Sequence, residues 1–390
     1  AVTIWQDEPK RGRFFGTIIA AAGDTLAICA PNNNVLLPIS SASGEVYICE
    51  IGEDGEPTST TILTAKEPKP RDLFGGNLAI SSDASTIAVA APGWRGEGTD
   101  GIVEIFARYG GNRWEHSQTI AMPEGYSDSK WGLRVNMEGG LLTVGSSEFN
   151  GRGATRVYQR GADSQWEFAT MFEAPEEDSG GNFGAWSAID PKTGDIFVSS
   201  GVVGMLQTVS NGDRITAFRR NEDGEGWERR FVLRAPTPSS IGFFGVEPRI
   251  VGDFLYTGYP GDAAGGIDGA GSVVCYRRDA EHPSGWVFDS AVLLPMEEPA
   301  VVGFGGRIDA APNRVAGMSL LPNENGGRNT VISIAERGGD GRWRFLAEIN
   351  GSVRDENWPG RLVFGDRFFA LCSAFAISPD GAKNAGAVYV

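Results

Sequence analysis

The sequence has few of the residues on which common catalytic sites depend. Only two histidines, His116 and His282, occur in 390 residues, so a general base built on imidazole has few options. We expect both at the surface, His116 on an outer strand and His282 in a charged turn. The GxSxG, HExxH and Walker motifs are absent. Sequence motifs therefore assign no catalytic residue.

Cysteine is also scarce, and its spacing argues against a zinc site. The four cysteines are Cys29, Cys49, Cys275 and Cys372. None forms a CxxC pair, which is the usual spacing of zinc ligands. Each lies in an apolar, strand-like run, and this position favours buried free thiols. We expect neither a metal site nor a cofactor.

Long apolar runs and an excess of positive charge are missing as well. No apolar run approaches the roughly 20 residues that span a bilayer, so we expect no membrane insertion. The 50 acidic residues outnumber the 34 basic ones, which gives a net charge of −16. Such a surface repels phosphate backbones and anionic lipid, so we expect no nucleic acid partner.

The start of the chain bears on its location. It opens AVTIWQDEPK, without an initiator methionine or a signal-like apolar segment, which fits a processed secreted protein or a trimmed chain. The acidic balance and the single glycosylation sequon, Asn350-Gly351-Ser352, favour the secreted alternative. We therefore expect an extracellular or cell-surface protein.

Glycine, by contrast, is abundant, and some of the glycines recur at regular intervals along the chain. The 55 glycines, about twice the average usage, predict many tight turns. An aromatic-glycine pair recurs at intervals of 52 to 61 residues. Its aromatic residues are Phe15, Phe74, Trp131, Phe183, Phe244 and Phe304, with a degenerate seventh copy at Trp358-Pro359-Gly360. A period of this length indicates a repeat architecture.

Each repeat carries four strand signals in the same order. After the aromatic-glycine pair comes a run ending in small residues, such as IAVAAP (87–92), then a glycine-rich loop and a third run, such as GIVEIFARY (101–109). The fourth run usually begins with tryptophan after a charged turn. This order predicts a meander of antiparallel hairpins. We expect the aromatic residue to fill the gap beside the small residues, its glycine to permit a tight bend, and the proline to end the second strand.

Seven such repeats predict an all-β protein, a seven-bladed β-propeller with four antiparallel strands in each blade. We expect a single domain over residues 1–390, with blades starting near residues 15, 74, 131, 183, 244, 304 and 358. The seventh repeat ends after three strands, while AVTIWQDEPKR at the amino end looks like a fourth strand. Residues 1–12 are therefore expected to complete blade seven and remove its exposed edge.

The repeats resemble the FG-GAP family, the propeller type found in integrin alpha subunits and many bacterial and algal extracellular proteins. Blade two is the best match, through Phe74-Gly75-Gly76, Ala90-Ala91-Pro92, Gly101-Ile102-Val103 and Arg113-Trp114-Glu115, and it is similar to the bacterial branch. The resemblance covers the whole chain. It implies an extracellular propeller whose function resides in its loops.

One feature of integrin-type repeats is missing here. Those repeats often carry an aspartate-rich calcium loop between the first two strands, whereas the corresponding turns here, such as SSDAS and DPKTGD, offer fewer than three alternating carboxylates. We therefore expect no structural calcium in these turns. The acidic hairpins Glu53-Asp54-Gly55-Glu56 and Glu222-Asp223-Gly224-Glu225 are expected to be solvated turns.

The loops on one face of such a propeller offer candidate ligand-binding residues. These are Trp94, Arg95, Phe149, Arg152, Tyr259, Asp262 and Asp268. Aromatic rings next to guanidinium or carboxylate groups suit sugar or peptide recognition, because the ring stacks and the polar groups fix the orientation. The structural alternative is that Trp94 and Tyr259 fold onto neighbouring loops.

The leading hypothesis is a non-enzymatic recognition or adhesion propeller that binds glycan or protein through this loop face. One alternative is a carbohydrate-active hydrolase or lyase that uses loop carboxylates such as Asp262 and Asp268. Another is a structural subunit of a larger assembly, which makes its contacts through the outer blade edges. The segment KEPKPRD (66–72) is expected to be a rigid connector between blades.

Overall fold

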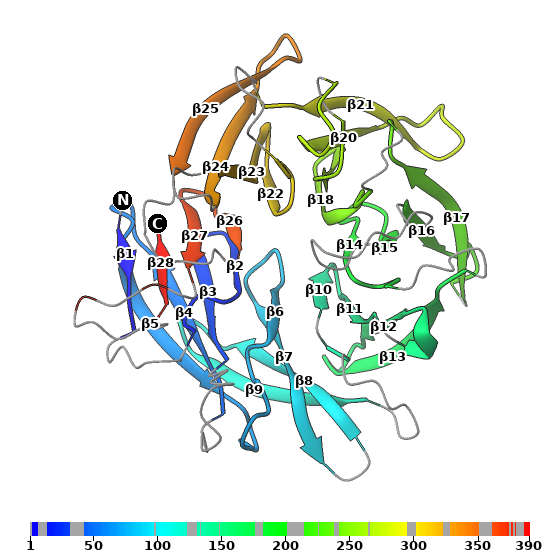
Figure 1. Cartoon of the computed structure of the whole chain (residues 1–390). Helices are drawn as coiled ribbons and strands as arrows, with labels where there is room; N and C mark the ends of the chain where they lie inside the picture. The colour runs from blue at the N-terminus through cyan, green and yellow to red at the C-terminus, as the bar shows by residue number, and fades with distance from the viewer. Residues whose placement is uncertain are drawn as a thin grey trace. The chain divides into compact units, whose positions relative to one another are not determined.

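The protein is an all-β chain of seven four-stranded antiparallel sheets (Figure 1). The computed structural model describes residues 2–6, 14–31, 43–96, 99–122, 131–132, 134–147, 149–175, 182–200, 214–224, 226–237, 242–263, 266–294, 302–322, 328–350, 361–373, 376, 379 and 386–390. In each sheet, strands that follow one another in the chain pair with each other. The predicted fold class, a seven-bladed β-propeller, is confirmed. Each sheet is called a blade below.

The chain divides into two compact units. Unit one comprises Ala1–Phe149, Arg156–Met171 and Asp355–Val390, and unit two comprises Asn150–Thr155 and Phe172–Arg354. Unit one contains blades one, two and seven and most of blade three, while unit two contains blades four, five and six. The expectation of a single domain over residues 1–390 stays a prediction.

Blades one to three and seven have the following strands. They are β2 (Ile19–Ala22), β3 (Thr25–Ala30), β4 (Glu45–Ile51) and β5 (Pro57–Thr64) in blade one; β6 (Asn77–Ile80), β7 (Thr86–Gly96), β8 (Thr99–Arg108) and β9 (Trp114–Ala121) in blade two; β10 (Arg134–Glu138), β11 (Leu141–Ser146), β12 (Ala154–Arg160) and β13 (Trp166–Glu173) in blade three; and β26 (Leu362–Phe364), β27 (Phe369–Ser373), β28 (Ala387–Tyr389) and β1 (Thr3–Ile4) in blade seven.

The blades of unit two follow the same order. They contain β14 (Ser187–Ile189), β15 (Ile196–Ser200), β16 (Arg214–Arg220) and β17 (Trp227–Arg234) in blade four; β18 (Val246–Val251), β19 (Phe254–Tyr259), β20 (Ser272–Arg278) and β21 (Trp286–Val292) in blade five; and β22 (Ile308–Ala311), β23 (Arg314–Pro322), β24 (Arg328–Arg337) and β25 (Trp343–Asn350) in blade six. The first strands of neighbouring blades contact one another, so that β18 lies between β14 and β22.

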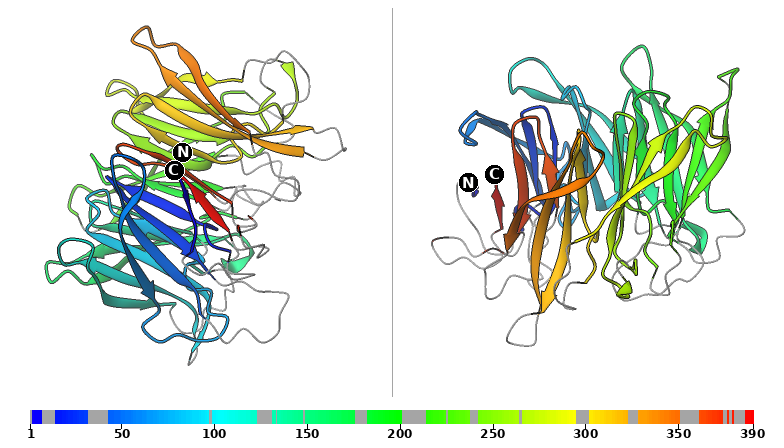
Figure 2. Two further views of the ribbon diagram at one scale, coloured as in Figure 1. Left: turned by 90° about the vertical axis from the view of Figure 1, so that its left-hand side faces the viewer. Right: turned by 90° about the horizontal axis from the view of Figure 1, so that it is seen from above.

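The amino-terminal strand completes the last blade, as the sequence predicts. Strand β1 pairs antiparallel with β28, with Thr3 opposite Tyr389 and Ile4 opposite Val388. Two backbone hydrogen bonds between Val2 and Val390, of 2.9 and 2.8 Å, extend the pairing to the end of the chain. The two chain ends therefore lie beside each other in both views of Figure 2. Residues 7–13 lie outside the described part of the predicted strand.

The aromatic-glycine pairs serve packing, as predicted. The six regular aromatic residues are all at most 1% exposed: Phe15, Phe74, Trp131, Phe183, Phe244 and Phe304. Each following glycine has a positive φ, for example 90° at Gly305, a conformation that favours glycine over residues with a side chain. The aromatic side chains belong to the clusters in which neighbouring blades pack together, such as Phe304 with Val273 and Cys275 of blade five. The degenerate copy at Trp358 lies outside the described residues.

A second set of glycines brings neighbouring blades close together. A Cβ atom on Gly271, just before β20, would lie 2.2 Å from the carbonyl oxygen of Phe304 in the next blade. Gly153 has the same relation to Phe183, at 2.2 Å, and Gly386 to Phe15, at 1.9 Å. Only a residue without a side chain allows the two backbones to approach this closely. The glycine before the third strand and the aromatic-glycine pair therefore form one seam between adjacent blades.

The expected role of proline is only partly right. Strands β3 and β19 end directly before Pro31 and Pro260, as predicted. Strand β7, however, continues past Pro92 to Gly96. The pairing with β8 is interrupted between Ala91 and Arg95 and then resumes, so the proline lies in the interruption, where its missing N–H breaks no ladder bond.

Two buried carboxylates hold the connector between blades one and two. Glu104 is 1% exposed, and its two oxygens accept the backbone N–H of Lys66 at 3.1 and 3.0 Å. Asp72, fully buried, accepts the N–H groups of Lys69 and Phe74, both at 3.0 Å. Hydrogen bonds donated by backbone N–H groups to these buried carboxylates thus fix the segment that the sequence predicted to be a rigid connector.

We predict that ionisation of Glu104 makes stability depend on pH. Burial raises the pKa of Glu104 from 4.5 to about 7, with a further contribution from the Asp72 carboxylate. A carboxyl whose pKa is raised on folding prefers the protonated form in the folded state, so stability falls as pH rises from about 4.5 to about 7. The shift corresponds to about 3 kcal/mol.

The measurement is urea unfolding of the wild type and Glu104→Gln at several pH values. Between pH of about 4 and about 8, the difference in unfolding free energy is expected to change by about 3 kcal/mol in favour of the glutamine variant. Glu115→Gln, an exposed residue of the same blade, is the control and should show no such trend. A pH-independent difference for Glu104→Gln would contradict the prediction.

Candidate functional site

Four of the predicted ligand-binding residues lie in blades two and three. The structure does not describe the side chains of two of them, and the other two lie at a short turn. Strand β7 runs through Trp94 and Arg95, but their side chains lie outside the described residues. Phe149 begins the short 3-10 turn η1 (Phe149–Gly151), and Arg152 follows it. Both side chains are half-buried. No described contact connects these four residues into a site.

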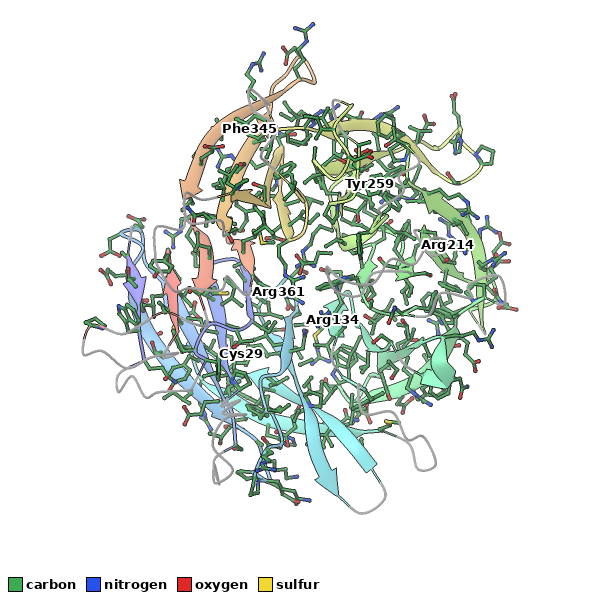
Figure 3. All side chains as sticks on the ribbon, in the orientation of Figure 1. Cys29, Arg134, Arg214, Tyr259, Phe345 and Arg361 are labelled. Atoms are coloured by element: carbon green, nitrogen blue, oxygen red, sulfur yellow. The ribbon has the colours of Figure 1, made fainter. Side chains whose placement is uncertain are left out.

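Tyr259 and Asp262 are brought together, but in a buried network (Figure 3 labels Tyr259). Tyr259 is 1% exposed, packs edge-on against Phe244 and donates its hydroxyl to the carbonyl of Thr237 at 2.8 Å. Asp262, 5% exposed, accepts the hydroxyls of Thr237 and Ser272, each at 2.6 Å. These contacts are those of the structural alternative, in which the tyrosine folds onto its neighbours. Asp268 is exposed, and ligand binding by the three residues stays a prediction.

The two histidines and the four cysteines do not form a metal-binding cluster. His116 lies half-buried on the outer strand β9, and His282 is exposed in the turn before β21. All four cysteines are buried and free, as predicted. Among the residues that the structure describes, no three or more histidine, cysteine, aspartate or glutamate side chains form a group that could hold a metal ion. Within the same residues, no helix has the length and apolar character needed to cross a membrane.

Arginine side chains form ion pairs with both aspartates of the turn DPKTGD between β14 and β15. Asp190 is fully buried and accepts the guanidinium of Arg278, from the next blade, at 2.7 Å. Asp195, 1% exposed, pairs with Arg219 of its own blade. Arg278 also lies over the ring of Trp286 at 4.6 Å. In this turn, guanidinium groups provide the positive charge that balances the two buried carboxylates.

One group of described side chains with unused hydrogen-bonding capacity lies on or directly before the first strands of unit two. Three residues after each repeat aromatic stand, in blade order, Ile18, Asn77, Arg134, Trp186, Glu247, Arg307 and Arg361. In blades five and six a residue of opposite charge follows two positions later, Arg249 after Glu247 and Asp309 after Arg307. Together with Trp186 of blade four, these four residues form what we call the first-strand cluster.

The four charged residues of the first-strand cluster alternate in sign, with Glu247 and Arg249 on β18, Arg307 directly before β22 and Asp309 on β22. The Nε atom of Arg249 donates to Oδ1 of Asp309 at 2.7 Å. Nη1 of Arg307 lies 3.8 Å from Oε1 of Glu247, which is an ion pair without a hydrogen bond. The first pair is tight and the second is loose. The two arginines therefore differ in how much of their donor capacity is used.

Glu247 is held in a strained conformation. Its φ is 44°, an uncommon value for a residue with a side chain, and the pairing of β18 with β19 is irregular between Val246 and Arg249. The side chain is 2% exposed, and Oε2 accepts the N–H of Ile308 at 3.0 Å. Asn77 of unit one makes the equivalent link to Val135 at 3.4 Å. The link between neighbouring first strands thus recurs, with an amide as the acceptor in unit one and a carboxylate in unit two.

Neighbouring carboxylates stabilise the guanidinium of Arg249, whose side chain is about one-quarter exposed. Burial opposes the charged form, but attraction to Asp309 and Glu247 outweighs it and raises the pKa of the guanidinium above its ordinary value. Asp309 takes up only Nε of this side chain. A guanidinium has five N–H donors, so the four on Nη1 and Nη2 have no hydrogen-bond acceptor among the described residues.

Arg307 is the most open member of the first-strand cluster. Its side chain is 34% exposed, and its guanidinium lies over the ring of Trp186 at 5.5 Å. In the described part of the chain, none of its five N–H donors makes a hydrogen bond. The cation–π contact and the loose pair with Glu247 position the group, while its donors stay available.

Sequence reasoning missed this cluster because it looked for ligand-binding residues only in the loops, whereas the cluster lies on and beside the first strands. The available signal was the fixed position three residues after each repeat aromatic, where five charged or polar residues and one tryptophan replace the isoleucine of blade one. Arg134 and Arg361 hold this position in unit one and are labelled in Figure 3. The reversed charge order of Glu247–Arg249 and Arg307–Asp309 was a second signal, since adjacent strands with this pattern can pair.

Comparisons with known proteins identify the fold only. No protein-family model and no curated protein matches the chain. The structure is similar to that of the periplasmic gluconolactonase PpgL of Pseudomonas aeruginosa, with a TM-score of 0.53 and 15% identity over 88% of this chain and 91% of the other. Similarity to Sqt1 of Saccharomyces cerevisiae is lower, with a TM-score of 0.44 and 12% identity over 95% and 82% of the respective chains. The likeness to the gluconolactonase supports the propeller fold.

Proposed function

We propose that the protein is a non-enzymatic recognition propeller that binds a saccharide at the first-strand cluster of unit two. The repeat pattern leads us to propose the bacterial branch of the FG-GAP family and a location outside the cytoplasm. The acidic sequence and its sequon agree with that location, and the gluconolactonase of similar fold is periplasmic by its description. The net charge of −16 argues for a saccharide over a nucleic acid.

The observation that carries the proposal is the unused donor capacity of Arg307. A guanidinium held by an aromatic ring and a carboxylate has little freedom left to lose when a ligand binds. Its N–H donors match the oxygen acceptors that cover a sugar. Arg249, on the neighbouring strand, adds further donors beside it.

The competing explanation is that the first-strand cluster only joins blades five and six. The pair between Arg249 and Asp309 has the short distance expected of such a link. Arg307 does not, because 3.8 Å from Glu247 is too long for a hydrogen bond and the side chain is one-third exposed. A purely structural role accounts for Arg249 but leaves the position of Arg307 unexplained.

The proposal predicts saccharide binding that depends on Arg307. On a panel of immobilised glycans, the wild type is expected to bind at least one class, and Arg307→Ala is expected to weaken that binding by about tenfold or more, since a hydrogen bond to a charged group contributes about 1.5–3 kcal/mol. Arg344→Ala is the matched control, because Arg344 is an exposed arginine of blade six paired with Asp340. Absence of binding to every glycan would overturn the proposal.

A second candidate, a carbohydrate-active enzyme, is favoured by one observation. Glu247 is a buried carboxylate with a strained backbone, and such strain is frequent at catalytic positions. Incubating the bound saccharide with the wild type and analysing the products separates the two functions. Cleavage that is lost in Glu247→Gln would establish the enzyme, whereas recovery of intact saccharide supports recognition.

A further inference from the structure

We infer that the group anchored at the first-strand cluster is a carboxylate, so that the ligand is an acidic saccharide such as a uronic acid. This inference rests on the proposed function, because it takes the ligand to be a saccharide and adds the chemistry of its anchoring group. It follows from which hydrogen-bonding groups of the cluster are already used and which are not.

The unused groups of the two arginines are all donors. Arg307 has five N–H donors and Arg249 has four that make no hydrogen bond to any described residue. The acceptors of the cluster are fewer and are engaged in part: Oε1 of Glu247 lies 3.8 Å from Nη1 of Arg307, beyond hydrogen-bond distance. Oδ1 of Asp309 accepts Nε of Arg249, and Oε2 of Glu247 accepts the N–H of Ile308. A complementary ligand is therefore rich in acceptors.

The shape of the donors favours a planar anion. A guanidinium presents pairs of N–H groups in one plane, which match the two oxygens of a carboxylate. The Nε atom of Arg249 is occupied, so this residue offers the edge formed by Nη1 and Nη2. The cation–π contact with Trp186, at 5.5 Å, restricts the position of the Arg307 guanidinium before the ligand arrives. Both features reduce the cost of forming a two-pronged contact.

A neutral sugar fits these donors less well. Hydroxyl oxygens accept hydrogen bonds, but a bond between a guanidinium and a carboxylate is roughly twice as strong as a neutral one. A sulfate ester supplies negative oxygens too, in a tetrahedral rather than a planar arrangement. The experiment therefore compares the carboxylate with an ester, a neutral sugar and a sulfate.

The charge of the whole protein provides an independent signature. Binding of an anion to a basic surface weakens steeply as salt is added. Here the net charge is −16 and the cluster contains two carboxylates beside its two arginines, so the long-range field repels the ligand and the attraction comes only from direct contact with the arginine donors. Salt screens both effects, and we expect the affinity for an acidic sugar to change by less than about twofold between about 50 and 200 mM salt.

The experiment is calorimetric titration of the full chain with sodium glucuronate, the methyl ester of glucuronic acid, glucose and a glucose sulfate ester. Glucuronate is expected to bind at least about tenfold more tightly than the other three probes. Arg307→Ala is expected to abolish that preference and Arg307→Lys to restore part of it, because lysine keeps the charge but not the fork. Arg344→Ala should bind like the wild type, and circular dichroism checks that each variant is folded.

Each of the other binding results would disprove either the carboxylate inference or the proposed function. If glucose or the methyl ester binds as tightly as glucuronate, the carboxylate inference is wrong while saccharide recognition stands. Tighter binding of the sulfate ester rejects the carboxylate in favour of a sulfated sugar. If none of the four probes binds but the glycan panel gives a neutral ligand, the inference again falls alone. If the panel is also empty, the proposed function falls with it.

Discussion

Replacing Gly271 with alanine is expected to lower the free energy of unfolding by about 4 kcal/mol. Two costs add at this position. The residue has a φ of +84°, which strains any side chain, and a Cβ atom there would lie 2.2 Å from the carbonyl oxygen of Phe304. Backbone atoms cannot move aside as the end of a flexible side chain can. The seam between blades five and six must therefore open for the variant to fold.

Gly266→Ala is the matched control for this prediction. Gly266 precedes Gly271 in the same connection and has almost the same φ, +83°, but no atom of the described residues lies within 4 Å of the position that its Cβ would take. It should cost only the backbone strain, about 1 kcal/mol. Urea unfolding followed by tryptophan fluorescence gives both values. Similar losses in the two variants would show that conformation alone, and not the close approach of the blades, explains the glycine.

The Arg278→Ala variant is expected to lose about 4 kcal/mol of unfolding free energy. Arg278 neutralises Asp190, whose side chain is fully buried between blades four and five. Removing one partner of a buried pair leaves a charge without compensation, which costs more than the pair itself contributes. The contact of Arg278 with Trp286 is lost as well. The same urea unfolding experiment measures the change.

Two further variants test the cause of that loss. In Arg278→Ala combined with Asp190→Asn, no uncompensated charge remains, so the double variant should be more stable than Arg278→Ala alone. Arg314→Ala removes an exposed arginine paired with Glu336 and should change stability by less than about 0.5 kcal/mol. If Asp190→Asn lowers the unfolding free energy of Arg278→Ala further instead of raising it, the electrostatic explanation is wrong.

Most of the fold could be predicted because its determinants are local and repeated. The aromatic-glycine pair combines a large buried ring with a backbone conformation that favours glycine, and both properties belong to single residues. The pairing of β1 with β28 followed from counting strands in the last repeat. Pro92 shows the limit of local rules, since the strand resumes after it through pairing of Arg95 with Asp100.

The candidate site was harder to predict because it depends on contacts between blades. Tyr259 looked like a loop aromatic, but its burial comes from Phe244 and from Thr237, which are 15 and 22 positions away in the chain. Likewise, the value of Arg307 as a ligand group depends on Trp186, more than one hundred residues earlier. Neither contact can be predicted from the residues next to Tyr259 or Arg307 in the sequence. Charge alternation at a fixed place in the repeat is the closest substitute.

The pairing of Thr3 and Ile4 with residues near 389 has a consequence for the order of events during synthesis. Strand β1 is synthesised long before its partner β28, so Thr3 and Ile4 stay without that partner while more than three hundred residues are added. The intervening hairpins can form as they emerge, because each joins neighbouring segments. The pairing of β1 with β28 joins strands more than three hundred residues apart, and we expect it to be the slow step of folding.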